Sequence, residues 1–252
     1  MKLTLIRHAT VRIEVAGQTL LVDPQLDPAG AREPVPNTPR PRRNPLVNLP
    51  IEAEQVVEGI DAVLLTHLHG DHWDDTAREL LDKHIPIFCQ PGDAQRLRGE
   101  GFTDARPVHG DATLGDVLIA RTDGRHGTGE IGEAMGIVSG FALHAPHEPS
   151  IYIAGDTILC DEVRRAIEEH KPQTVLVNAS GARFNTGEAI VMTNDDVVAL
   201  AREFPDVTVV AIHFETVSHG TQTRADLQER LVAEGLTQRV LIPPDGAQIQ
   251  VG

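Results

Sequence analysis

The chain has 252 residues, a formal net charge of −15 and 3% aromatic residues, which argues against a broad nucleic-acid surface because acidic proteins repel phosphates. No apolar run is long enough to cross a bilayer, so no membrane span is expected. The length and composition predict one domain over residues 1–252 that acts on a small molecule, with a homo-oligomer left open.

The first predicted elements are strands within residues 2–23, where apolar and polar side chains alternate. Ala16-Gly17-Gln18 separates two of these runs, which is typical of a hairpin. His8 lies between the first two strands, and Asp23 follows the third. For His8, a structural hydrogen-bonding role and a substrate-facing role are both open.

Residues 25–50 form a segment rich in proline and arginine. Its seven prolines forbid a regular helix or a central strand. One interpretation is a lid whose arginines, with Arg40 as the candidate contact, meet an anionic substrate, because guanidinium groups bind phosphate and carboxylate. The alternative is a solvated surface loop or a contact between subunits.

The strongest chemical signal comes where a short apolar strand should end. His67, His69, Asp71 and His72 fall within six residues there. His67 and His69 are two residues apart, so an extended backbone projects both imidazoles to the same side. Gly70 allows a tight turn, which places the second pair for a neighbouring ion. Since imidazole and carboxylate are ordinary ligands of zinc and related ions, this stretch predicts a metal site.

His67-x-His69-x-Asp71-His72 after an apolar strand resembles the signature of the metallo-β-lactamase superfamily, most of whose members are binuclear metallohydrolases. The resemblance covers the whole chain. It implies an α/β fold, an αββα sandwich of two mixed β-sheets flanked by helices, with the metals at one edge between the sheets.

The opening Arg7-His8-Ala9-Thr10 is similar to that of the branch that holds ascorbate-6-phosphate lactonase-like and N-acyl-phosphatidylethanolamine phospholipase D-like proteins, with Arg in place of Gly. The aspartate of an Asp-Pro pair, Asp23 here, supports the metal loop in that branch. Neither His8 nor Asp23 is a primary ligand there.

The resemblance also implies ligands at three later strand ends. His126 lies in a glycine-flanked turn, Asp156 in a Gly-Asp-Thr sequence, and His213 after the apolar run 207–212. The histidines that compete with His126 are His109, His144 and His147. The implied set is His67, His69 and His126 on one ion, Asp71, His72 and His213 on the other, and Asp156 between them.

A carboxylate can hold two cations about 3.5–4 Å apart, and two dications lower the pKa of a bridging water enough to hold hydroxide at neutral pH. The implied function is therefore a binuclear hydrolase that uses a metal-bridging hydroxide on a small ester, lactone or phosphodiester. An anionic substrate is one interpretation, because of the arginines of the 25–50 segment. Asp71 would orient the hydroxide. His219 is the candidate general acid, with a supporting or solvent-exposed role left open, and Arg183 is a further candidate substrate contact.

Histidine and carboxylate ligands without thiolate favour zinc, although manganese, iron and nickel accept the same set. A di-iron redox protein and a non-catalytic metal-binding protein on the same scaffold are the alternatives. Cys89 and Cys160 are the only cysteines, neither belongs to a Cys-x-x-Cys pair, and no secretory signal precedes the first strand. We therefore expect reduced thiols and a cytoplasmic location.

Later helices are predicted from their apolar spacing and their first residues. Asn194 and Thr223 are each expected to begin a helix. The last two strands, at 240–242 and 247–251, are expected to close the second half of the sandwich.

Overall fold

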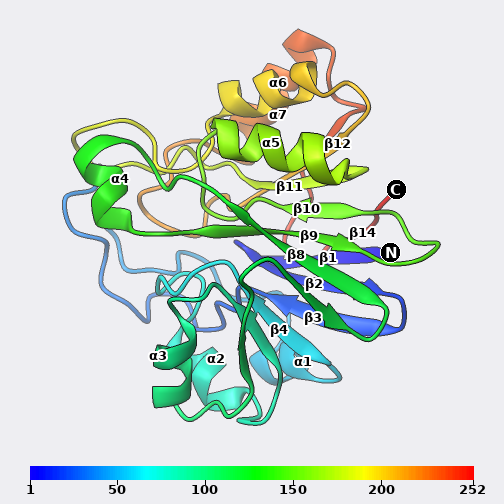
Figure 1. Cartoon of the computed structure of the whole chain (residues 1–252). Helices are drawn as coiled ribbons and strands as arrows, with labels where there is room; N and C mark the ends of the chain where they lie inside the picture. The colour runs from blue at the N-terminus through cyan, green and yellow to red at the C-terminus, as the bar shows by residue number, and fades with distance from the viewer.

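Two seven-stranded mixed sheets face each other in the computed structural model, which describes residues 1–252 (Figure 1). The first contains, in spatial order, β14 (Gln248–Gln250), β1 (Lys2–Arg7), β2 (Thr10–Val15), β3 (Gln18–Val22), β4 (Ala62–Leu65), β5 (Ile87–Cys89) and β6 (Ala105–Pro107). The second contains β13 (Val240–Leu241), β12 (Thr208–Ile212), β11 (Thr174–Asn178), β10 (Ile151–Ile153), β9 (Ser139–His144), β8 (Val117–Asp123) and β7 (Asp111–Leu114). Strands β3 to β6 and β10 to β13 run parallel.

Helices cover the outer faces of both sheets, so the architecture is the αββα sandwich that the resemblance implied (Figure 1). The first sheet carries α1 (Ala53–Val57), α2 (Asp75–Leu80) and α3 (Ala94–Gly99), and the second carries α5 (Asp161–His170), α6 (Asn194–Glu203) and α7 (Arg224–Glu234). The remaining helix, α4 (Gly129–Met135), lies with the long loops at the left of Figure 1 and has no fully buried residue. No helix combines the length and apolar character needed to cross a membrane.

Apolar cores fill the three spaces between the layers, one beneath each set of helices and one between the sheets. Trp73 belongs to the core beneath the first sheet, where it is fully buried and packs against Phe102. Its indole nitrogen donates a hydrogen bond to Glu100. The tryptophan that follows His72 is therefore part of the packing that supports the histidine-rich turn.

The beginning of α6 differs from the prediction by one residue. Thr193, not Asn194, is the N-cap: its hydroxyl accepts a hydrogen bond from the Asp196 amide, and the Asp196 carboxylate accepts one from the Thr193 amide. This reciprocal arrangement satisfies two amides that a helix otherwise leaves unpaired. The helix predicted to begin at Thr223 has the same arrangement.

The final strand belongs to the first sheet, so its predicted place in the second half was wrong. β14 pairs antiparallel with β1, with Lys2 opposite Gln250, whereas β13 pairs with β12 as expected. A short alternating strand carries no signal for the edge that it joins. Here it covers the hydrogen-bonding groups that β1 would otherwise leave open, and it brings the two chain ends together (Figure 1).

Candidate metal centre

The carboxyl ends of parallel strands from both sheets meet at one edge of the sandwich. β4 ends just before the His67 turn, and β10 ends just before Gly155. Gly155 has a φ of +71°, and a Cβ there would lie 2.9 Å from the carbonyl oxygen of Ser139. Only glycine allows this approach, which places Asp156 opposite the histidine turn.

Asp156 lies at the centre of a histidine cluster. Its Oδ2 is 3.3 Å from Nε2 of His72 and 3.4 Å from Nε2 of His126. Its Oδ1 is 3.3 Å from Nε2 of His213 and accepts a hydrogen bond of 2.6 Å from Asn178. Burial opposes ionisation, but the neighbouring histidines hold the pKa of Asp156 well below its usual range. The cluster thus surrounds a buried anion.

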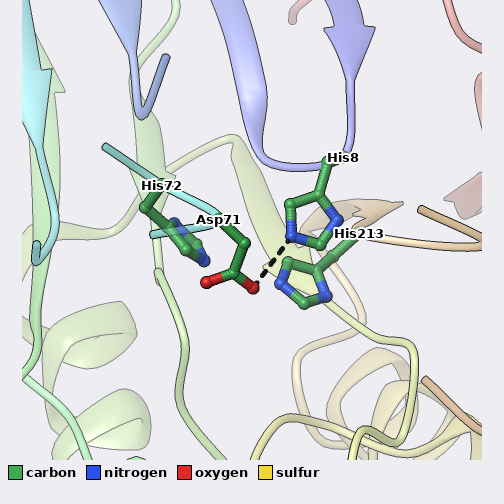
Figure 2. A group of neighbouring side chains, drawn as sticks. All are labelled: His8, Asp71, His72 and His213. Carbon is green, nitrogen blue, oxygen red and sulfur yellow. Dashed lines mark hydrogen bonds and ion pairs between the residues drawn. The ribbon is translucent and has the colours of Figure 1, made fainter. Parts of the chain in front are cut away.

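The nitrogen and oxygen donors form two groups in which all atoms lie within 4.8 Å of one another. A third group, which contains Asp156, overlaps both. All seven residues that the resemblance implied come together, and His8 joins them. Figure 2 shows His8 beside Asp71, His72 and His213. The first group is His67, His69 and His126, the second is His8, Asp71, His72 and His213, and the overlapping one is His67, His72 and Asp156.

Hydrogen bonds to Nδ1 turn the histidine rings so that Nε2 faces the cluster. The Asp23 carboxylate lies 2.8 Å from Nδ1 of His72, and the carbonyl oxygen of Ile190 lies 2.8 Å from Nδ1 of His126. A partner on the far ring nitrogen is typical of metal-binding histidines. The Thr66 hydroxyl lies 3.1 Å from Nδ1 of His67, and the Ser180 hydroxyl lies 3.1 Å from Nδ1 of His213.

Several of these supporting residues were not expected from the sequence. Asn178 and Ser180 lie at and just after the end of β11. The sequence could have indicated both residues, because polar side chains that follow a buried parallel strand lie at the edge of the sheet where the other strand ends meet. The Ile190 carbonyl had no sequence signal, since any residue type can provide it.

The distances between Asp156 and the histidine nitrogens fit ligands that share a cation better than they fit direct hydrogen bonds. Charge-assisted N–H···O bonds are about 2.7–2.9 Å long, whereas Asp156 lies 3.3–3.4 Å from three histidine nitrogens. Two ligand atoms that are each about 2.1 Å from a tetrahedral ion lie about 3.4 Å apart. In addition, Nε2 of His67, His72 and His213 is buried without a hydrogen-bond partner, a state that costs about 1–3 kcal/mol for each atom.

Protonation also suits most of this donor set. Burial lowers the pKa of His67 and His213 well below the ordinary value, so both rings are neutral, as ligation requires. His72 differs. Burial opposes its charged form, but Asp156 and Asp23 raise the pKa of His72 well above the ordinary value. Cation binding at His72 would therefore release a proton.

Asp23→Asn is expected to weaken metal binding about 10–100-fold, the usual effect of losing the partner of a ligating histidine. The Asp23 carboxylate accepts from the amide and hydroxyl of Thr66 and holds Nδ1 of His72, and an amide cannot accept all of these bonds. Competition with a chelator measures the affinity. Asp61→Asn is the matched control, since this exposed carboxylate accepts only from Thr19 beside the same strand. Equal affinities for the two variants would contradict the expectation.

A pocket of about 210 Å³ opens beside the cluster. Its polar side includes His219, which is 7% exposed and has a buried Nδ1 without a partner. Burial lowers the pKa of His219, so its ring is neutral at pH 7. The pocket is lined by Val35, His69, Gly70, Asp71, His126, Met135, Asp156, Phe184, Ile190 and His219.

No arginine or lysine lines this pocket, so the substrate-contact roles of Arg40 and Arg183 stay predictions. Arg40 is exposed on the 25–50 loop, and Arg183 is tied to this region by its backbone amide, which donates to the His219 carbonyl. Arg32 instead binds Asp27 and the Gly70 carbonyl. Arg43 likewise donates to the carbonyl oxygens of Gly30 and Ala31, so two guanidinium groups of this loop have protein partners. The loop contributes the apolar Val35 to the pocket.

The competing histidines lie outside the cluster. His109 and His147 are exposed. His144 lies at the end of β9, where its ring is 5.8 Å from that of His170.

Residues 18–214 match the family described as the Beta-lactamase superfamily domain. The UPF0173 protein YddR of Bacillus subtilis (strain 168) is 34% identical, with 98% of each chain covered. A UPF0173 metal-dependent hydrolase of Xanthobacter autotrophicus is 27% identical, with 93% of this chain and 95% of that protein covered.

Two solved structures are similar over almost their whole length. An isothiocyanate hydrolase from Delia radicum gut bacteria has a TM-score of 0.94 and 34% identity, covering 99% of this chain and 98% of that one. A structure from Veillonella parvula DSM 2008, described as a possible metal-dependent hydrolase, has a TM-score of 0.97 and 28% identity, covering 100% and 99%.

The two facing sheets form the metallo-β-lactamase fold, and the full-length relatives define the class as metal-dependent hydrolases. The chain belongs to the β-lactamase superfamily. Its place in the ascorbate-6-phosphate lactonase-like branch stays a prediction.

Proposed function

We propose that this enzyme is a binuclear metal-dependent hydrolase of a small, uncharged substrate with an apolar group. One observation carries the proposal: two groups of donor atoms meet around Asp156, beside a pocket with apolar walls. His67, His69 and His126 would hold one ion, Asp71, His72 and His213 the other, and Asp156 both.

Two divalent ions, when bound there, would supply a Lewis acid and lower the pKa of a water molecule. Zinc is the expected metal because the set is rich in imidazole, with manganese, iron and nickel as alternatives. Asp71 and His219 border the pocket. Asp71 would accept a hydrogen bond from the attacking water, and His219 would exchange a proton with the leaving group. The redox alternative would replace a histidine with a carboxylate, and the three donor groups contain none beyond Asp71 and Asp156.

The pocket walls favour an uncharged substrate over the anionic one considered from the sequence. Val35, Met135, Phe184 and Ile190 form the apolar side, and no cationic side chain lines the pocket. The net charge of −15 also repels anions. A volume of about 210 Å³ suits a group of only a few heavy atoms.

An isothiocyanate is the first substrate to test, because the solved structure with 34% identity is that of an isothiocyanate hydrolase. An isothiocyanate is small and uncharged, and it carries an electrophilic carbon beside an organic group. Water would add to this carbon and the C–N bond would break, which gives an amine and carbonyl sulfide. Small esters and lactones have the same general features and follow in the screen.

The test is a substrate panel given to zinc-loaded and chelator-treated protein: methyl and benzyl isothiocyanate, a small lactone, phenyl acetate and a phosphodiester. We expect hydrolysis of an uncharged substrate that requires metal and that excess inorganic phosphate does not inhibit. Activity confined to the phosphodiester, or competitive inhibition by phosphate, would overturn the proposed substrate class.

Phe184→Ala is expected to raise KM for benzyl isothiocyanate about tenfold with little change in kcat. Removing the ring exposes part of the substrate's apolar surface, and about 50 Å² at 25 cal/mol per Å² corresponds to this factor. Methyl isothiocyanate is the internal control, since it is too small to need the Phe184 wall. Equal KM changes for both substrates would contradict a role of Phe184 in apolar recognition.

A further inference from the structure

We infer that His8 is a positioning residue that donates a hydrogen bond to Asp71 and so orients this carboxylate toward the second ion. The inference rests on the proposed binuclear function. It adds a residue that the resemblance left outside the ligand set.

The contact between His8 and Asp71 links the first turn of the chain to the metal-binding turn. His8 lies between β1 and β2, with its ring fully buried and Nε2 3.3 Å from Oδ2 of Asp71 (Figure 2). An ionised carboxylate only accepts hydrogen bonds. The hydrogen of this pair therefore belongs to Nε2 of His8.

Asp71 has no hydrogen-bond partner other than His8. Its side chain is 21% exposed and borders the pocket, and no other hydrogen bond fixes its orientation. Most other residues of the proposed ligand set have a protein group that fixes their orientation. The pairs are His67 with Thr66, His72 with Asp23, His126 with Ile190, His213 with Ser180 and Asp156 with Asn178. His8 supplies the corresponding group for Asp71.

The backbone holds the His8 ring in place at some cost in conformational energy. The His213 amide donates to the His8 carbonyl at 3.1 Å, and the two ring centroids are 3.6 Å apart. His8 and His213 have φ angles of 63° and 76°, which are uncommon for residues other than glycine. Such conformations persist where the surrounding structure requires them, and they concentrate at functional sites.

An ordinary core histidine is the alternative explanation. A histidine retained for packing alone would be expected to have both ring nitrogens satisfied or solvated. Nδ1 of His8 is buried without a partner, and its Nε2 faces a carboxylate of the candidate metal centre. The surroundings of His8 thus provide a partner for Nε2 and none for Nδ1, as expected if the function of the ring is to place Nε2 beside Asp71.

Two amide variants test the inference because they differ in reach. The glutamine amide of His8→Gln can take the place of Nε2 and donate to Asp71, but an amide is a poor zinc ligand. Asparagine is one methylene shorter and cannot reach, although it tolerates positive φ well. We expect His8→Asn to weaken binding of the second zinc about 10–100-fold while the first zinc stays, and His8→Gln to remain within about threefold of the wild type.

Chelator competition with native mass spectrometry counts the ions, and the absorption spectrum of the cobalt-loaded protein reports the ligands of the second ion. His144→Asn, at the end of β9, is the control. Unchanged affinity in His8→Asn would overturn the inference. Equal loss of the second ion in both His8 variants would also overturn it, because His8 would then be a ligand. A wild-type protein that binds only one zinc would overturn the binuclear proposal itself. Results on the His8 variants alone would overturn only the role of His8.

Discussion

Replacing Asp156 with asparagine is expected to reduce bound metal from two ions to one or fewer per chain and hydrolysis by at least about a thousandfold. Asp156 is the carboxylate that contacts histidine nitrogens of both donor groups. Asparagine keeps the shape and removes the negative charge, so two dications would repel each other without a shared anion. Mass spectrometry of protein purified without added metal or chelator measures the metal content.

Asp161→Asn is the matched control for this change. Asp161 is the first residue of α5, five positions later in the chain, and its side chain is 82% exposed. We expect this variant to keep both ions and full activity. Two ions per chain in Asp156→Asn would show that this carboxylate does not join the two sites.

Arg7→Met is expected to lower the free energy of unfolding by about 3 kcal/mol, and the melting temperature by about 10 °C. Arg7 is fully buried and donates to the carbonyl oxygens of Val47, Gln25 and Asp27 at 2.9–3.0 Å. Burial lowers the pKa of Arg7 to about 10, so the group is still charged at pH 7. Methionine has a similar length but no donor, and it would leave three carbonyls of the 25–50 loop region unpaired.

Urea and thermal unfolding measure the effect of this substitution. Arg12→Met on β2 is the control: Arg12 is partly exposed and has no side-chain hydrogen bond, so we expect a change within about 0.5 kcal/mol. If Arg7→Met were as stable as Arg12→Met, the buried guanidinium would not hold the loop.

The sequence by itself determined the features that short stretches encode. Alternating apolar residues located the strands within residues 2–23, helical spacing located the helices that begin near 194 and 223, and the His67 to His72 spacing indicated the chemistry before any contact was known. Asp156 and His213 were recognisable because each follows a buried strand. These inferences were possible because strand ends and ligand spacing are local properties.

Only the tertiary structure decided how distant segments meet. Val35, Met135 and Phe184 come from separate segments, and only the fold makes them one apolar wall of the pocket. The same is true of β14, which joined the free edge of β1, and of His8, whose neighbour Asp71 lies 63 residues away. Neither partner choice is encoded locally, because it depends on which surfaces remain unpaired after both sheets have formed.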